Sequence, residues 1–205
     1  MYKQIFLKRG KEESLKRFHP WIFSGAIHHM DEGIEEGETV RVITAAGEFI
    51  AVGHYQIGSI AVRVLSFEDI EINTDFWCER LQSALDVRIG VGIADSPTNN
   101  TYRLVHGEGD YLPGLVIDCY GSTAVMQAHS VGMHVCRNEI CQALVQVMGD
   151  RIANVYYKSE TTLPYKADLH QENGFLVGGD ASNVAMENGL KFHIDWLRGQ
   201  KTGFF

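Results

Sequence analysis

The chain has 205 residues, of which 18 are lysine or arginine and 26 are aspartate or glutamate, so its formal net charge is −8. Apolar residues make up 45% and charged residues 21%, which excludes a disordered chain. No run approaches the ~18 consecutive apolar residues of a membrane span. The N-terminus lacks the apolar region of a secretory signal, so we expect a cytoplasmic protein with no membrane partner.

Charge is unevenly distributed along the chain. Residues 1–30 carry six basic and two acidic side chains, whereas the rest carries twelve basic and twenty-four acidic ones. A net acidic protein is a poor candidate for a nucleic-acid binder, but a localised basic segment can form a phosphate-binding face. A solvated surface is an equally good interpretation of these charges.

The first 70 residues predict a small β-barrel. Residues 3–9 alternate loosely and suit an edge strand. Ser14 can cap a short helical turn through Arg17, which Pro20 would limit. Further strands are predicted at 39–43, 49–55 and 60–65, with a hairpin turn at 45–48. Several short strands in succession favour a barrel, because closure removes the edges of a sheet.

The pattern changes after Glu68 from period two to period 3.6. Asn73 or Thr74 can cap a helix, and an apolar stripe follows at helical spacing. The stripe consists of Trp77, Leu81, Ala84, Leu85 and Arg88. This change of period places a domain boundary near residues 68–74.

A second helix and several strands are predicted beyond this boundary. Ser130 can cap the helix and Gly149 can end it. Its stripe consists of Met133, Cys136, Ile140, Ala143, Leu144 and Val147. Strands are predicted at 102–105, 115–117, 124–128, 154–158, 174–177 and 190–194. Asn188-Gly189 indicates a type I′ hairpin, and the whole segment is predicted to be an α+β domain with a largely antiparallel sheet.

Two groups of residues that include histidine are candidate chemical sites. His106, Glu108 and Asp110 lie within five residues and are separated by glycines. They can act in metal binding or acid–base catalysis, or cap the backbone of a turn, which is the favoured interpretation. His28 and His29 should point to opposite faces of a strand, which argues against a shared metal ion. No metal site is expected.

Residues 19–25 are rich in aromatic side chains and follow Lys16 and Arg17. Planar rings beside cations suit RNA bases and phosphates. We assign Trp21 and Phe23 to the core of the barrel rather than to base stacking. Lys16 and Arg17 are assigned to phosphate contact.

Three separated motifs resemble those of one bacterial family. Residues 8–10, 19–27, 53–55 and 60–63 are similar to its N-terminal PUA domain. Residues 103–121 are similar to its central-domain motif, and residues 198–205 resemble the Gly-Gln-Lys-Thr-Gly-Phe-Phe signature that opens its methyltransferase domain. On these motifs the chain resembles the PUA-containing, S-adenosylmethionine-dependent ribosomal RNA (cytosine-5) methyltransferases.

The resemblance implies a domain organisation. Residues 1–70 are expected to form a PUA-like RNA-binding domain, and residues 71–197 a central α+β domain with two principal helices. Residues 198–205 are expected to start the methyltransferase domain. Family members continue into a Rossmann-like domain that holds the catalytic cysteine and most of the cofactor pocket. That domain is expected to be absent here, as in an engineered or proteolysed fragment.

The resemblance also implies a reaction. A cysteine thiolate adds to carbon 6 of cytosine, carbon 5 attacks the methyl group of S-adenosylmethionine, and a base removes the proton. None of the four cysteines matches the family's nucleophile, so no catalytic residue and no bound cofactor are expected in this chain. The candidates near the cofactor of the parent enzyme are Gln200, Lys201, Thr202, Gly203 and Phe204. The RNA-binding candidates are Lys8, Arg9, Lys16, Arg17, His19 and Trp21.

The resulting hypothesis is the RNA-recognition portion of a methyltransferase that modifies carbon 5 of a cytosine in large-subunit ribosomal RNA, inactive alone. Its expected partner is ribosomal RNA, and the resemblance also implies that the protein can form a homodimer. A free-standing PUA-type RNA-binding adaptor is the alternative. A small hydrolase that uses His106, Glu108 and Asp110 is a third hypothesis.

Overall fold

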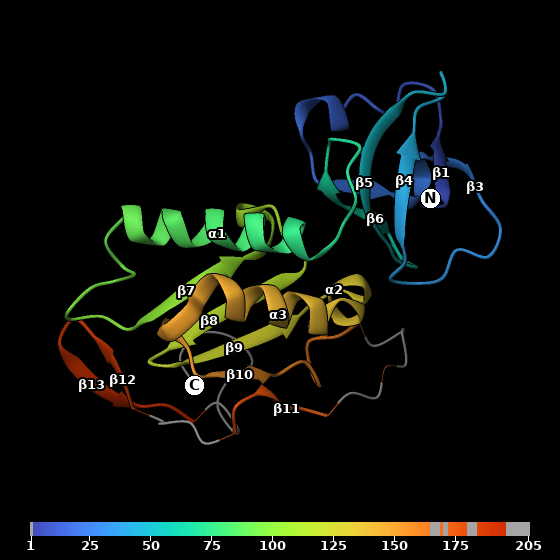
Figure 1. The fold of residues 1–205 in the computed structure, drawn as a ribbon. Coiled ribbons are helices and arrows are strands. Elements are labelled where there is room, and N and C mark those ends of the chain that lie inside the picture. The colour runs from blue at the N-terminus through green and yellow to red at the C-terminus, as the bar shows by residue number, and fades with distance from the viewer. Residues whose placement is uncertain (1, 165–168, 170–171, 180–183, 196–205) are drawn as a thin grey trace.

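The computed structural model describes residues 2–164, 169, 172–179 and 184–195. Figure 1 shows two sheets that meet along one side, and a separate two-stranded hairpin at the far end of the second sheet. Each sheet has its own apolar core. No helix in these ranges is long and apolar enough to cross a membrane.

Six strands form the first sheet, in the order β2-β6-β5-β4-β1-β3. Their bounds are β1 Gln4–Leu7, β2 Trp21–Phe23, β3 Ile27–Met30, β4 Thr39–Ile43, β5 Phe49–Tyr55 and β6 Ile60–Ser66. Side chains at alternating positions fill one core, among them Ile5, Leu7, Ile22, Val40, Val42 and Val62. Two helical turns, η1 (Leu15–Arg17) and η2 (Ser24–Ala26), precede and follow β2 in the chain.

Local signals located most of these strands correctly. β4 and β5 have the predicted bounds, and the Thr44 backbone N–H donates to the Glu48 carbonyl at 2.8 Å across the predicted turn. The edge position predicted for residues 3–9 is wrong, because β1 lies between β4 and β3 and pairs with both. The side chain of Ser14 does not cap η1, which ends at Phe18 with a φ of 60°.

Helix α1 (Thr74–Gly90) begins as predicted. The Asn73 side chain accepts a hydrogen bond from the Phe76 backbone N–H at 3.0 Å, which satisfies one free donor of the first turn. Four residues of the predicted stripe are buried, namely Trp77, Leu81, Ala84 and Leu85. The fifth, Arg88, forms an ion pair with Asp110 instead.

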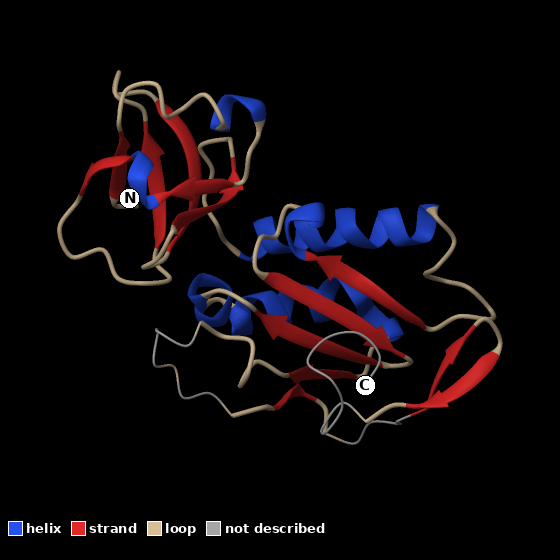
Figure 2. Ribbon diagram, turned by 180° about the vertical axis from the view of Figure 1, so that it is seen from behind, coloured by secondary structure: helices blue, strands red, loops and turns tan. Residues whose placement is uncertain are grey.

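The second sheet has the order β11-β10-β9-β8-β7, and helices cover one of its faces (Figure 1, Figure 2). Its strands are β7 Thr101–His106, β8 Leu115–Tyr120, β9 Thr123–Ala128, β10 Asn154–Tyr157 and β11 Gly174–Val177. Helices α2 (Val131–Val135) and α3 (Arg137–Met148) join α1 on that face. The expected number of two principal helices is wrong. Cys136, with a ψ of 4°, leaves the helical conformation and divides the predicted second helix in two.

This sheet is mixed, so the expected α+β class with a mainly antiparallel sheet is also wrong. β9 and β10 run parallel, whereas the other pairs are antiparallel. A parallel pair needs a crossover of a dozen or more residues, because the chain must return to the same end of the sheet. α2 and α3 provide that crossover, and the result is a β-α-β unit that the prediction did not include.

The other face of the second sheet carries a smaller apolar cluster. It consists of Tyr120, Val125, Tyr156, Ala185 and Ile194. Ala185 belongs to β12 (Val184–Glu187), which pairs with β13 (Leu190–His193). The predicted type I′ turn between them is confirmed by positive φ angles of 51° at Asn188 and 79° at Gly189.

The two sheets meet along a seam that we define by His54, Gln56, Val131 and Gly132. A Cβ atom on Gly132 would lie 2.2 Å from Cγ of His54, so the imidazole of β5 packs directly on the bare Cα of α2. The side-chain oxygen of Gln56 accepts a hydrogen bond from the Val131 backbone N–H at 3.3 Å. The start of α2 is therefore fixed to the end of β5.

The His54 imidazole is neutral at neutral pH. Burial lowers its pKa to about 4, and the positive charge of Arg63 acts in the same direction. Its Nε2 atom lies 3.7 Å from the sulfur of Cys136. The buried site favours the unprotonated form of the His54 ring. Because the pKa of the ring in the folded protein lies below its ordinary value of 6.5, the stability that depends on the neutral ring is complete above pH 6.5 and declines as the pH falls toward 4.

We predict that Gly132→Ala destabilises the protein. The added methyl group collides with the His54 ring, and overpacking of this kind costs about 1–3 kcal/mol. Guanidinium-induced unfolding measures the loss. Gly90→Ala is the matched control, because a Cβ there meets nothing within 4 Å. Equal unfolding free energies for the two variants would contradict the close packing at the seam.

Candidate nucleic-acid interface

Lys8 and Arg9 follow β1 and line a groove of about 640 Å³, which we call the basic groove. The other lining residues are Phe6, Leu7, His28, His29, Thr44, Ala45, Ala46 and Gly47. The lining contains two fully basic side chains and two histidines, and none of these residues carries a carboxylate. Such a lining attracts anions without competition from acids on the protein.

One wall of the basic groove is a stack of rings. The rings of Phe6 and His29 are stacked at 4.3 Å, with an angle of 9° between their planes. His28 lines the same groove, and its ring meets that of His29 edge-on at 5.1 Å. The prediction that His28 and His29 point to opposite faces is therefore wrong. β3 is the end strand of its sheet and is largely exposed, so neither ring is drawn into the core.

Lys16 and Arg17 lie on η1, where Glu13 holds both of them. The ammonium group of Lys16 is 2.9 Å from Oε1 of Glu13, and Nε of Arg17 donates to the Glu13 carbonyl at 3.3 Å. All three side chains are exposed. Glu13 therefore offsets part of the positive charge that the sequence places here.

His19 and Trp21 lie at the side of the first sheet that faces the second. The indole Nε1 of Trp21 donates to Oε1 of Glu108 at 2.8 Å. Trp21 is only half-buried and Phe23 is 49% exposed, so the prediction that both fill the core is wrong. Ile22 between them is the residue of β2 that points inward. Two aromatic rings are thus available for contact at the surface.

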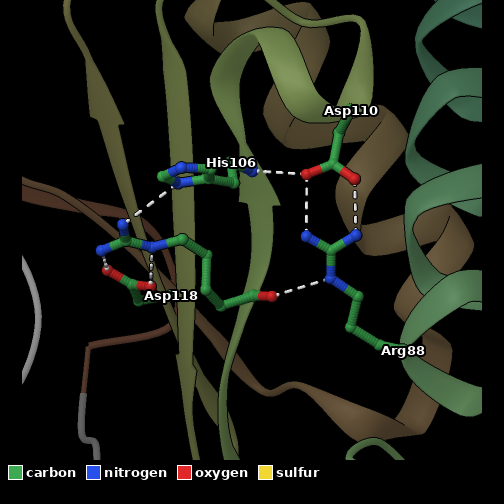
Figure 3. A network of polar contacts seen from close by, with 5 residues as sticks. Arg88, His106, Asp110 and Asp118 are labelled. Atoms are coloured by element: carbon green, nitrogen blue, oxygen red, sulfur yellow. Dashed lines mark hydrogen bonds and ion pairs between the residues drawn. The ribbon is translucent and has the colours of Figure 1, made fainter. Parts of the chain in front are cut away.

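The acidic groups of the motif at 106–110 are already engaged by the protein (Figure 3). Asp110 forms a two-pronged ion pair with Arg88 and accepts a hydrogen bond from the His106 backbone N–H at 2.6 Å. A second pair joins Arg103 to Asp118 at 2.8 and 3.0 Å. The described residues contain no group of three or more side chains placed to hold a metal ion. These contacts favour the interpretation of the motif as a turn, η3 (Gly107–Asp110).

A second cavity of about 280 Å³ opens where the seam reaches the surface, and we call it the seam pocket. Arg63 of β6 forms one wall. The opposite wall consists of His106, Gly107, Glu108, Gly114, Leu115, Val116 and His129. Sequence reasoning missed Arg63 and His129 as site residues. Each lies in or beside an ordinary strand, and only the docking of the two sheets brings them together.

None of the four cysteines has the character of a nucleophile. Burial raises the pKa of Cys119 and Cys136 to about 12 and that of Cys141 to about 11. The pKa of Cys78 is also raised, chiefly by burial. A reactive cysteine needs a lowered pKa, so these thiols agree with the interpretation as packed side chains. The candidates Gln200, Lys201, Thr202, Gly203 and Phe204 lie outside the described residues.

Comparison with known proteins identifies the first sheet. Residues 5–67 match the family model of the PUA-like domain. Over its whole length the chain is 39% identical to the ribosomal RNA large subunit methyltransferase I of Vibrio parahaemolyticus and 37% identical to that of Aliivibrio fischeri. It covers 51% and 52% of these proteins. The chain thus spans about half the length of the curated relatives that it matches.

Solved methyltransferases share the fold. A SAM-dependent methyltransferase from Streptococcus mutans matches with a TM-score of 0.74 at 21% identity, covering 92% of this chain and 47% of that chain. A methyltransferase complexed with SAH matches with a TM-score of 0.73. The expected absence of a Rossmann-like methyltransferase domain is contradicted by this likeness, in which 92% of this chain aligns with 47% of a methyltransferase chain. The β-α-β unit formed by β9, α2, α3 and β10 is the element that the antiparallel prediction left out.

We predict that Asp110→Asn lowers the free energy of unfolding by about 3 kcal/mol, because it leaves the guanidinium of Arg88 largely buried and without its counter-charge. The change is measured by denaturant unfolding. Asp95→Asn is the control, since Asp95 makes a two-pronged pair with Arg151 on the exposed surface and its loss should matter little. Similar losses for both variants would mean that burial does not strengthen the first pair.

Proposed function

We propose that this chain is the RNA-recognising part of an S-adenosylmethionine-dependent methyltransferase that modifies carbon 5 of a cytosine in large-subunit ribosomal RNA. The basic groove is the observation that carries the proposal, because it combines cations and stacked rings within a PUA-like domain. Phosphates supply most of the affinity of an RNA contact, and rings accept unpaired bases. In this proposal residues 1–70 bind RNA, and residues 71–197 position this first domain against the RNA.

The choice of ribosomal RNA rests on the relatives, which are named as large-subunit methyltransferases and match along the whole chain. The choice of carbon 5 rests on the three motifs that resemble the cytosine-5 family. S-adenosylmethionine is the methyl donor in this proposal, and SAH is the form that it takes after transfer. The thiolate that adds to carbon 6 is not one of the four cysteines in this chain, since their pKa values are raised.

A competition experiment tests whether this chain and a full-length relative bind the same RNA. A full-length relative, such as the enzyme of Vibrio parahaemolyticus, is incubated with large-subunit ribosomal RNA and labelled S-adenosylmethionine, and the nucleosides are separated by mass spectrometry. We expect 5-methylcytidine as the product and slower methylation when this chain is added in excess. A product methylated elsewhere would overturn the choice of carbon 5. RNA binding without competition would favour the free-standing adaptor instead.

A charge-reversal experiment tests the basic groove. We predict that Lys8→Glu with Arg9→Glu weakens RNA binding and reduces the slope of log affinity against log salt by about 1.4, or 0.7 for each lost phosphate contact of a single strand. Lys16→Glu with Arg17→Glu should also weaken binding, but with a smaller change in slope, because Glu13 already offsets part of the Lys16 charge. Affinity and slope that stay unchanged in the first variant would remove the basic groove from the interface.

A further inference from the structure

The seam pocket places one cation and one anion on opposite walls without joining them. Arg63 comes from the PUA-like domain, and Glu108 comes from the turn η3 of the second unit. Within the described part of the chain no ion pair connects the two side chains, although the Glu108 charge acts on Arg63. The space between them is therefore open to a ligand that contacts both.

The pocket offers hydrogen-bonding groups of both kinds. Nη1 of Arg63 donates to Gln56 at 3.1 Å, which orients the guanidinium and leaves its other N–H groups accessible. Oε1 of Glu108 accepts from Trp21, which leaves Oε2 to accept from a ligand. Nε2 of His129 is buried and makes no hydrogen bond in the described residues. A ligand that donates to Glu108 and accepts from Arg63 would satisfy these two groups.

Charge and size select the kind of ligand. Arg63 and Glu108 are side chains of opposite charge in the lining, which also contains His106 and His129. Burial and the Arg103 charge lower the pKa of His129. This balance suits an uncharged group, whereas the basic groove suits phosphate. A volume of about 280 Å³ lies at the small end of ligand pockets and fits one planar ring system rather than a strand of RNA.

Exposed aromatic rings lie beside the pocket. The ring of His19 lies 5.9 Å from that of Trp21 and 6.3 Å from that of Phe23. Trp21 reaches the pocket through its hydrogen bond to Glu108. Such rings stack on the unpaired bases of single-stranded RNA.

We propose that the seam pocket binds one unpaired nucleobase that carries both an amino group and a carbonyl group, as cytosine and guanine do. Glu108 accepts from the amino group, and Arg63 donates to the carbonyl oxygen. The proposal rests on RNA binding by the PUA-like domain and adds a base-selective site to it. Uracil lacks the amino group, and adenine lacks the carbonyl group.

Binding of defined oligonucleotides tests the site. Fluorescence anisotropy is measured with ten-nucleotide oligocytidylate, oligouridylate and oligoadenylate. We expect the oligocytidylate to bind about tenfold more tightly than the other two, as a pair of well-placed hydrogen bonds typically discriminates between bases. Equal affinities for the three oligonucleotides would overturn the proposal.

A conservative substitution connects the preference to the pocket. Glu108→Gln keeps an oxygen that can accept from Trp21 but removes the negative charge, so the preference for oligocytidylate should disappear while the salt slope stays the same. Glu79→Gln, at an exposed position of α1 outside both proposed surfaces, is the matched control and should keep the preference. Thermal melting establishes that each variant is folded. A preference that survives in Glu108→Gln would overturn the proposal.

Photocrosslinking provides a second readout. An oligocytidylate with one 5-iodocytidine should crosslink to Trp21 or His129, as located by mass spectrometry. Crosslinks confined to the basic groove would overturn the proposal and leave the proposed function intact. If none of the oligonucleotides binds and ribosomal RNA is not bound either, the proposed function itself fails.

Discussion

The arrangement of the two sheets depends on one contact, the ring of His54 against the bare Cα of Gly132. A Cβ at this position would lie within 2.2 Å of the ring, so only glycine permits the approach. The contact excludes water from the imidazole, and the ring therefore stays uncharged. Two hydrogen bonds, from the Val131 backbone N–H to Gln56 and from Trp21 to Glu108, join the same two sheets beside this contact.

The protein presents two surfaces of different chemistry to a ligand. The basic groove lies within the PUA-like domain and has cations without acids, which suits a backbone of phosphates. The seam pocket balances Arg63 against Glu108 and suits an uncharged group. Phosphate contacts position an RNA and base contacts select among sequences, so under the proposed function the basic groove would supply affinity and the seam pocket specificity.

Sequence patterns located the elements better than their arrangement. The strands β4 and β5, the Asn73 cap and the turn at Asn188 follow from local propensities and were predicted correctly. The parallel pairing of β9 with β10 depends on a crossover, which periodicity along a single segment does not reveal. The apolar stripe continues through Cys136, so the sequence pattern does not predict the break between α2 and α3 at this residue.

Site residues were predictable from the sequence only where they are adjacent in the chain. Lys8 and Arg9 stand out in a basic segment, and the structure places both in one groove. Arg63 and His129 carry no local signal, because they meet only when the two sheets dock. Trp21 was predicted to fill the core of the barrel, whereas its place on an end strand leaves the ring half-exposed.

The seam also bears on the order in which the protein folds. Two hydrogen bonds between the sheets join residues far apart in the chain: Gln56 with Val131 and Trp21 with Glu108 are separated by 75 and 87 positions. Closing loops of this length costs more entropy than closing a hairpin, so local strand pairs form before such contacts. We therefore expect the seam pocket to form late in folding, and a chain with both sheets complete but undocked would lack it, because its lining comes from both sheets.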